Sequence, residues 1–352
     1  LIYPNRNADG TTETLPIGNE KISGFYLDKN DPIHGNELIF TNKKAYVIYG
    51  YAAVPEGETV TFDPGSRVYF HSDSGIIVPK TASIHINGSK STTDKLENEV
   101  IFGGDRQQPN FGYIPGQWGT VWLQNGSTNN TIQNLTLKNA TVGLFIEGND
   151  GTTMPIKNTQ IYNCTHYGIQ AKSALIEGEN IVINYTGKAS LACTYGGNYK
   201  FTHSTFNNDW SSPEQAAVYI SNYIDGANPE TRDLTGATFN NCIIYGSYSN
   251  ELLLDKKSGA AFVYQFNNCL IKSNKNNDPD YLFETDPVHY NSIILNKDPK
   301  FFNPNINNFN IDETSSAFAK GNSAYLIPFD ILGITRTVPP DLGAYQNKPF
   351  PK

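Results

Sequence analysis

The sequence lacks long apolar runs, and this absence excludes one class of protein at once. No stretch approaches the ~20 consecutive apolar residues that a membrane-spanning helix needs. Amphipathic helical patterns are missing too, since the apolar residues come in short stretches that alternate with polar residues or break at Gly, Pro and Asn. We therefore expect no transmembrane segment and a chain built from short strands.

Charged residues are scarce and unbalanced. They make up 17% of the chain, and 26 Lys and Arg against 34 Asp and Glu give a formal net charge of −8. No basic run is present, so we do not expect a nucleic-acid partner. A strongly polyanionic glycan is disfavoured for the same reason, although a local basic groove is compatible with this net charge. The aromatic content of 12% is too high for a disordered chain.

Cysteine is rare, and its spacing excludes the common zinc sites. None of the four cysteines forms a Cys-x-x-Cys pair, so we expect no structural zinc and no metal or cofactor of any other kind. Cys242 and Cys269 occupy equivalent positions in two repeats and are expected to stack. Two states stay open for them: buried thiols, which we favour, or a disulfide, which depends on a Cβ geometry that spacing alone does not reveal.

Residues 131–146 show the pattern around which the rest of the chain is organised. Leu135 and Leu137 alternate with polar residues, as in a half-buried strand. After Asn139 the apolar positions change from odd to even, which would turn the buried face outward in a straight strand. A corner at Asn139 removes the conflict, and Asn tolerates the left-handed backbone that a corner needs. The stretch is therefore predicted to be strand, corner, strand around one core.

The same unit returns along the chain at intervals of 22 to 33 residues, as in an array of structural repeats. The clearest returns are Leu137 to Ile161 (24 residues), Ile161 to Ile183 (22 residues), 205–208 to 238–241 (33 residues) and 239–242 to 266–269 (27 residues). Short strands without helices between them predict an all-β fold, a single-stranded parallel β-helix in which each repeat is one coil. The four-stranded repeat of a β-propeller is not seen.

We predict one continuous domain, because a solenoid extends its core along a single axis. Residues 1–44 are rich in Gly and Pro and are the expected N-terminal cap, which hides the open end of the stack. Coils are expected over 45–275, interrupted by a long aromatic loop at 103–118. Residues 276–352, where the repeat decays, are expected to form the last coils and a C-terminal closing segment.

Several motifs carry a resemblance to a known group of proteins. They are 54–57 (Val-Pro-Glu-Gly), 64–70 (Pro-Gly-Ser-Arg-Val-Tyr-Phe), 104–106 (Gly-Asp-Arg), 114–119 (Ile-Pro-Gly-Gln-Trp-Gly), 129–132 (Asn-Asn-Thr-Ile) and 340–345 (Pro-Asp-Leu-Gly-Ala-Tyr). Together they resemble the right-handed parallel β-helix surface proteins, often lipoproteins, of Gram-negative gut-type bacteria. The resemblance implies a right-handed coil and an extracellular or outer-membrane location, lipid-anchored through a segment absent from this chain. It implies no particular activity.

Enzymes that degrade polysaccharides are the alternative on this fold, which also hosts adhesins without catalysis. A hydrolase needs clustered carboxylates, and the polygalacturonase motifs Asn-Thr-Asp, Asp-Asp and Gly-His-Gly are absent. A lyase needs a base and a group that neutralises a uronate, supplied by Arg106 or by Ca²⁺ in this alternative alone. The weak candidates for catalytic groups are His166, Tyr167, Lys172 and His203, against their reading as ordinary surface residues.

A glycan-binding site needs aromatic rings that stack on sugar faces and polar groups that bond hydroxyls. The ligand-binding candidates lie in or beside the long loops, and they are Asp105, Arg106, Tyr113, Trp118, Trp122 and Trp210. The competing interpretation is that Trp118 and Tyr113 only pin the loop and that Asp105 and Arg106 pair with each other. We predict a monomeric, secreted or cell-surface protein that binds a polysaccharide or another cell-surface ligand without catalysis, a lyase being the alternative ahead of a hydrolase.

Overall fold

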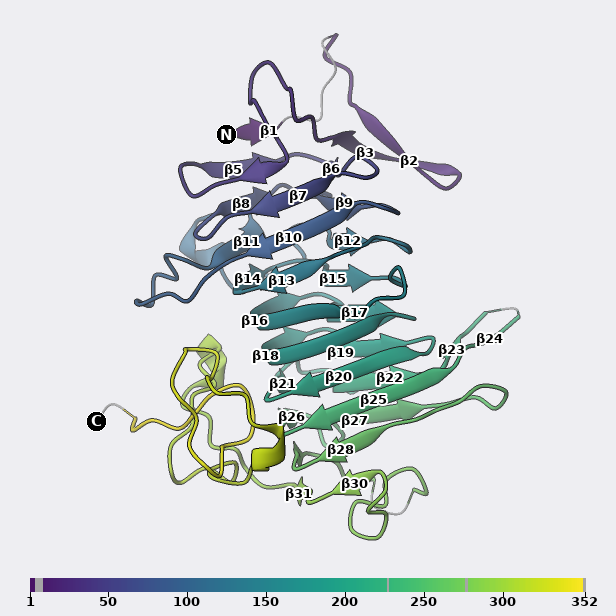
Figure 1. The fold of residues 1–352 in the computed structure, drawn as a ribbon, viewed down its shortest axis with the longest axis vertical. Coiled ribbons are helices and arrows are strands. Elements are labelled where there is room, and N and C mark those ends of the chain that lie inside the picture. The colour runs from purple at the N-terminus through teal and green to yellow at the C-terminus, as the bar shows by residue number, and fades with distance from the viewer. Residues whose placement is uncertain (4–8, 227, 276–277, 351–352) are drawn as a thin grey trace.

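The computed structural model describes residues 1–3, 9–226, 228–275 and 278–350. Within these ranges the chain forms 31 strands and three short 3₁₀ helices, stacked along one long axis (Figure 1). The predicted all-β class is confirmed, and the long parallel sheets are compatible with a β-solenoid. Residues 4–8 of the predicted cap, together with 276, 277, 351 and 352 of the predicted C-terminal part, lie outside the described residues.

The larger sheet has 19 strands. They are β1 (Ile2–Tyr3), β4 (Ile39–Phe40), β5 (Ala45–Ile48), β7 (Thr59–Phe62), β8 (Arg67–Phe70), β10 (Ser83–Asn87), β11 (Val100–Gly104), β13 (Thr131–Gln133), β14 (Leu135–Lys138), β16 (Met154–Cys164), β18 (Leu175–Thr186), β20 (Gly197–Thr202), β21 (Thr205–Asn208), β25 (Leu234–Asn240), β26 (Ile243–Gly246), β28 (Gln265–Asn267), β29 (Leu270–Ile271), β30 (Tyr290–Asn291) and β31 (Ile294–Leu295).

A second sheet has ten strands. They are β2 (Thr14–Ile17), β3 (Glu20–Tyr26), β6 (Tyr51–Ala53), β9 (Gly75–Val78), β12 (Val121–Leu123), β15 (Val142–Ile146), β17 (Tyr167–Lys172), β19 (Ala189–Thr194), β22 (Ala216–Ser221) and β27 (Leu252–Asp255). The remaining elements are the hairpin β23 (Tyr223–Ile224) and β24 (Glu230–Thr231), and the 3₁₀ helices η1 (Pro109–Phe111), η2 (Pro304–Ile306) and η3 (Ser323–Tyr325). Only β2–β3 and β23–β24 pair antiparallel among the named strands.

The corner predicted at Asn139 is confirmed. β14 ends at Lys138 in the larger sheet and β15 begins at Val142 in the ten-stranded sheet, while Asn139 has a φ of 66°. A second bend in the same repeat lies at Asn134, between β13 and β14, with a φ of 49°. Asn163 takes the same left-handed conformation one repeat later. Asn serves at these bends because its backbone tolerates positive φ.

The strand register confirms most of the predicted repeats and corrects one. Leu137 pairs with Ile161, Ile161 with Ile183, and Phe239 with Phe266, as the sequence spacing predicts. The proposed return of 205–208 at 238–241 is wrong, because Phe206 pairs instead with Ile244, 38 positions later. Between them the chain makes an excursion at 209–215 and inserts the hairpin β23–β24, which lengthens this repeat.

One apolar core runs the length of the stack, from Tyr3 to Tyr290. Each inward position lies above the same position of the neighbouring repeat, as Leu144, Ile169 and Leu191 do in the ten-stranded sheet. Phe239 and Phe266 stack at 4.9 Å between ring centroids. All four cysteines are free and buried, so Cys242 and Cys269 occur as the favoured buried thiols. Such a column of matched apolar side chains accounts for the long parallel stack.

The N-terminal end is covered by the chain before β5. The ring of Tyr3 lies 5.8 Å from that of Phe40 and 4.5 Å from the imidazole of His34, above the first repeat. The hairpin β2–β3 packs Leu15 against the outer face of the ten-stranded sheet. β3 and β4 already pair in parallel with β6 and β7, so stacking starts within residues 1–44, where the sequence predicted only a cap.

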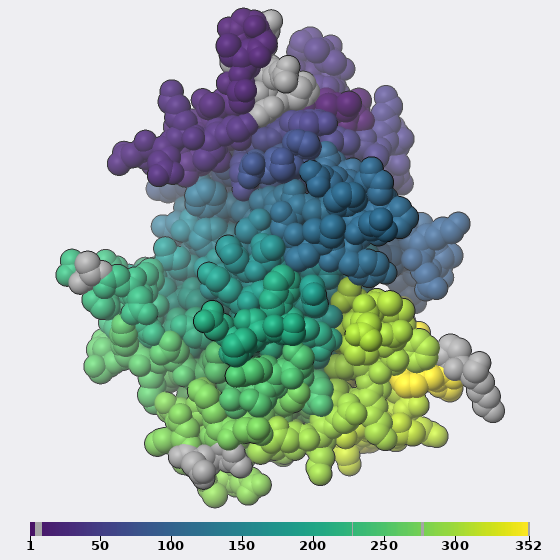
Figure 2. All heavy atoms as spheres, turned by 180° about the vertical axis from the view of Figure 1, so that it is seen from behind, coloured from purple at the N-terminus to yellow at the C-terminus, as the bar shows by residue number. Residues whose placement is uncertain are grey.

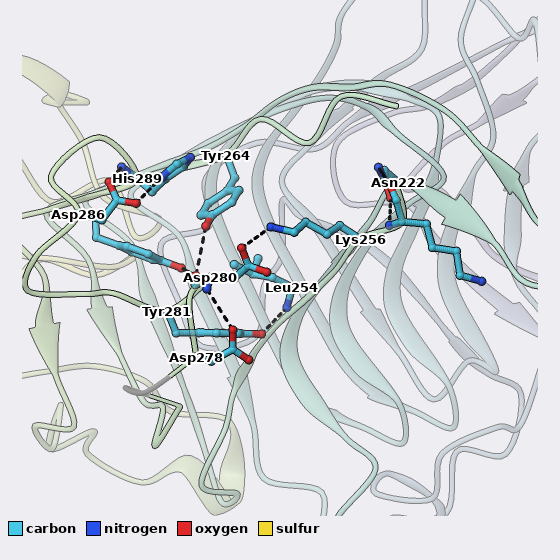
Figure 3. A network of polar contacts seen from close by, with 11 residues as sticks. Asn222, Leu254, Lys256, Tyr264, Asp278, Asp280, Tyr281, Asp286 and His289 are labelled. Carbon is cyan, nitrogen blue, oxygen red and sulfur yellow. Dashed lines mark hydrogen bonds and ion pairs between the residues drawn. The ribbon is translucent and has the colours of Figure 1, made fainter. Parts of the chain in front are cut away.

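Residues 278–290 pack against β27, the last strand of the ten-stranded sheet, through a network of polar contacts (Figure 3). Tyr281 is buried in the core, and its hydroxyl accepts a hydrogen bond from the amide of Leu254 at 2.7 Å. The carbonyl of Asp280 accepts bonds from the hydroxyls of Tyr264 and Tyr290, while its carboxylate pairs with Lys256. Hydrogen-bonded side chains therefore cover the edge of β27, as the end of an array of repeats requires.

The C-terminal segment does not close the end of the stack. From residue 297 the chain turns back and lies along the flank of the larger sheet (Figure 1). Leu342 packs against Ile243 and Leu270, and Tyr345 packs against Tyr162 and Val182. The 340–345 motif therefore closes a lateral surface of the larger sheet.

Candidate functional site

One hollow on the described surface is a groove of about 740 Å³, which we call the lateral groove. It lies on the outer face of the larger sheet, between two loops that follow β10 and β11 and the returning C-terminal segment. In Figure 2 the blue part of the chain lies above the yellow-green C-terminal segment on the right flank. A groove of this size is in the range of pockets that hold small molecules or short polymer segments.

The floor of the lateral groove consists of outward-facing side chains from β14 and β16. Thr136 and Gln160 are register partners on these strands, and so are Lys138 and Tyr162. Alternation along each strand sends Leu137 and Ile161 inward, so that polar groups face the groove at every second position. The hydroxyl of Tyr162 donates to Oε1 of Gln160 at 2.8 Å.

Two aromatic side chains stand at opposite rims of the groove. Tyr113, from the loop 103–118, is 63% exposed. Phe302, from the C-terminal segment, is 40% exposed, and its ring lies 4.8 Å from that of Phe350. Exposed aromatic rings of this kind offer flat apolar faces beside a polar floor.

The floor residue Lys138 has a buried acid, Glu99, for a neighbour, although Glu99 itself does not line the groove. Oε2 of Glu99 accepts hydrogen bonds from Thr136 at 2.6 Å and from Gln160 at 3.4 Å. Burial raises the pKa of Glu99 above its ordinary value and lowers the pKa of Lys138, and the attraction between the two charges opposes both shifts. Titratable groups with shifted pKa values at a cavity are typical of a functional site.

The sequence pattern explains how the loop 103–118 is held over this groove. The side-chain amide of Asn139 donates to the carbonyls of Gly112 and Ile114, and that of Asn163 donates to Gly112. Both asparagines occupy corner positions of successive repeats. The corners that the fold requires therefore also hold the rim that carries Tyr113.

Trp118 was predicted to bind a ligand, and this prediction is wrong. The side chain is 1% exposed, its ring stacks on Phe70 at 4.3 Å, and its indole N–H donates to the carbonyl of Lys138 at 2.8 Å. A ring enclosed in this way has no face left for a sugar. The residue anchors the end of the loop, which was the competing interpretation.

Asp105 and Arg106 do not pair with each other in the described structure. Asp105 accepts a hydrogen bond from Nδ1 of His71 at 2.7 Å, and the Arg106 guanidinium lies 5.1 Å from the ring centroid of Phe111. Arg106 is exposed, but neither residue lines the lateral groove. Their predicted contact with a ligand stays a prediction.

Trp122 and Lys172 lie on the ten-stranded sheet, away from the lateral groove. Both contact Glu147: the indole N–H of Trp122 donates to Oε2 at 3.0 Å, and Nζ of Lys172 lies 3.7 Å from Oε1. Trp122 also stacks on Phe145 at 5.8 Å. Polar contacts to Glu147 thus link neighbouring strands of this sheet. Lys172 does not line the pocket that contains His166 and Tyr167.

His203 was a candidate base, and the structure contradicts this role. Its ring is completely buried, and its Nε2 lies 3.1 Å from the side-chain amide of Asn241. Burial, and then the charge of Arg336, lower the pKa of His203 to about 2. A group without access to solvent cannot meet a polysaccharide, so His203 is a structural residue at a bend of the larger sheet.

His166, Tyr167 and Trp210 are the predicted residues that the fold does bring together. They line a second hollow, which we call the corner pocket, where the chain leaves the Asn163 corner for the ten-stranded sheet. The candidate His203 is not among its lining residues. The reason is that His203 lies at the bend between β20 and β21, whereas His166 directly precedes β17.

One cluster contains residue types that bind metals. Ligand atoms of Asp31, His34 and Glu37 lie within 4.8 Å of one another in the loop before β4. Each already has partners there: Asp31 accepts from the amides of Ile33 and His34, and Glu37 from His34 and the amide of Asp28. These hydrogen bonds stabilise the conformation of the loop, which accounts for the cluster without a metal. The absence of a metal stays a prediction.

The sequence interpretation missed the floor residues Lys138, Gln160 and Tyr162 and the neighbouring acid Glu99. A usable signal was present, because Lys138 and Tyr162 are outward positions of two aligned repeats, adjacent to Leu137 and Ile161. The opposite wall was not predictable, since it comes from residues more than 140 positions later in the chain.

No known protein family matches the chain, and a search of the curated proteins found no relative. Within the described ranges, no helix has the length and apolar character needed to cross a membrane. The geometry of the molecule therefore carries the functional argument alone.

Proposed function

We propose that this chain is a right-handed parallel β-helix protein that binds a polysaccharide in the lateral groove without catalysis. Parallel strands in one sheet are joined by right-handed connections in nearly all proteins, which supports that hand for the coil. The sequence resemblance supports a secreted or surface location with a lipid anchor, and we propose that the protein is a monomer. The partner is a glycan, with neither nucleic acid nor a resident cofactor.

The observation that carries the proposal is the composition of the groove. Its volume of about 740 Å³ is bounded by the exposed rings of Tyr113 and Phe302 and floored by the partly exposed Lys138 and Gln160. Sugar rings present flat C–H faces to aromatic side chains and hydroxyls to polar ones, so this surface matches both faces of a glycan.

Binding to an array of plant, host and microbial polysaccharides, followed by calorimetry with each hit, tests the proposal. Tyr113→Ala should weaken binding by about tenfold, because an aromatic contact contributes up to ~1.5 kcal/mol beyond its buried area. Tyr26→Ala is the matched control, since Tyr26 is also exposed but lies on β3 near the N-terminal end. Equal affinity of the Tyr113→Ala variant and the control would refute the groove as the site.

A polysaccharide lyase is the second candidate, and Lys138 on the groove floor favours it. The lowered pKa of Lys138 increases the share of neutral amine, which can remove the C5 proton of a uronate. The C4–C5 double bond then forms while the C4–O bond breaks, and the leaving oxygen takes its proton from solvent. Lys348 on the opposite wall can neutralise the uronate carboxylate.

This candidate uses none of the predicted residues His166, Tyr167, Lys172 or His203, and its requirement for Ca²⁺ stays open. The test is release of new reducing ends and of unsaturated sugars from the same polysaccharides, with and without Ca²⁺. Activity in the wild type that is lost in Lys138→Gln would establish the lyase and overturn binding without catalysis. If polysaccharides that bind in the groove release neither reducing ends nor unsaturated sugars, the result would support binding without catalysis.

A further inference from the structure

The corner pocket has features of a second binding site, separate from the lateral groove. It has a volume of about 360 Å³ and lies over β17, β19 and β22. Its concavity follows from the sequence: Tyr167, Ala189 and Ala216 are successive register partners. Two small side chains beside a large one leave a step in the sheet surface, and the 209–215 excursion walls the other side.

Aromatic rings form the walls, and neighbouring groups hold them in place. Trp210 packs against Tyr185 with 4.9 Å between ring centroids. The hydroxyl of Tyr219 donates to Asp255 at 3.1 Å, which fixes that ring. Tyr167 stands at the near edge of the pocket. Rings fixed before binding lose little entropy when a ligand stacks on them.

The charges around the pocket are arranged asymmetrically. Lys188 is exposed, and among the ion pairs of the described residues none includes it. Its ammonium lies 5.8 Å from the ring centroid of Tyr167. His166 lies beside it, and burial followed by the Lys188 charge lowers the pKa of His166, which favours the neutral imidazole. Glu214 is exposed on the lining, and Asp255 is already bonded to Tyr219 and Tyr223.

We propose that the corner pocket binds a single sugar ring that bears a carboxylate. The ring packs between Trp210 and Tyr167, and the carboxylate pairs with the ammonium of Lys188, which has no carboxylate partner within the described chain. His166 supplies a neutral hydrogen-bonding group to a ring hydroxyl. The site is separate from the lateral groove, because the two hollows share no lining residue.

Methyl glucuronide and methyl glucoside are matched probes, since they differ in the carboxylate alone. We expect calorimetry or protein-observed NMR on the full chain to show tighter binding of the glucuronide. Lys188→Gln should weaken glucuronide binding by about threefold, the size of a partly exposed ion pair, and make the two probes equal. Trp210→Ala should weaken both probes by about tenfold through the lost ring contact.

Lys172→Gln is the matched control, because it removes the same charge from the same sheet at a residue that Glu147 already pairs. Equal affinity of the wild type for both probes, or no binding of glucuronide, would overturn the proposal. Tyr113→Ala separates the two sites: it should leave glucuronide binding intact while weakening polysaccharide binding. The two proposals are therefore tested separately, the lateral groove by Tyr113→Ala and the corner pocket by Lys188→Gln.

Discussion

Glu251 offers a direct test of the electrostatics of this fold. The residue directly precedes β27 and is completely buried. Its Oε1 accepts hydrogen bonds from the amide of Tyr248 at 2.7 Å and from Gln215 at 3.2 Å, while Oε2 has no partner. Burial outweighs these bonds and raises the pKa of Glu251 to about 8. The perturbation is Glu251→Gln, which keeps the shape of the side chain and removes its titration.

The direction of the effect follows from proton binding. Between pH 4.5 and about 8 the folded chain keeps the Glu251 proton and the unfolded chain has lost it. The stabilisation linked to this group is therefore fully present below pH 4.5 and is lost as the pH rises to about 8. Each pKa unit corresponds to ~1.4 kcal/mol, so the loss across this window is about 5 kcal/mol at most.

The assay is urea unfolding followed by tryptophan fluorescence from pH 5 to pH 9. The free energy of unfolding of the wild type should fall more steeply with pH than that of Glu251→Gln, and the variant should be the more stable protein at pH 8. Glu56→Gln is the control, because Glu56 is exposed in a turn. Parallel pH profiles for wild type and Glu251→Gln would refute a proton held at this carboxyl.

Three further predictions concern the loop, its corner and the thiols. Trp118→Ala should cost about 3–5 kcal/mol of unfolding free energy, as removal of a buried aromatic side chain does, measured by urea titration against Trp122→Ala, which should cost less. Asn139→Ala should cost about 1–3 kcal/mol, because its φ of 66° is strained for Ala, whereas Asn139→Gly should lose only the bonds to the loop. Cys242 and Cys269 should resist a thiol reagent in the native protein and react in urea, since both are buried and free; reaction of neither in urea would indicate a disulfide.

The candidate site could be predicted only in part. The aromatic loop 103–118 was recognisable as an interruption of the repeat, but the sequence did not show which of its rings faces solvent. Trp118 is buried in the core because its ring packs against Phe70, whereas the ring of Tyr113 is exposed to solvent. The weak catalytic candidates could not be separated for a similar reason: the sequence offered His166 and His203 alike without showing that one is exposed and the other completely buried.

The sequence by itself determined the all-β class, the corner at Asn139 and most of the register, because alternation and repeat spacing are local properties of the chain. Leu137 and Ile161 pair because both are apolar residues at equivalent positions of successive repeats. Only the tertiary structure decided where the C-terminal segment lies and hence that a groove exists. That contact joins Tyr345 to Tyr162, and no local pattern encodes a pairing between segments so far apart. Burial is likewise a property of the whole fold, so the raised pKa values of Glu99 and Glu251 could be recognised only from the structure.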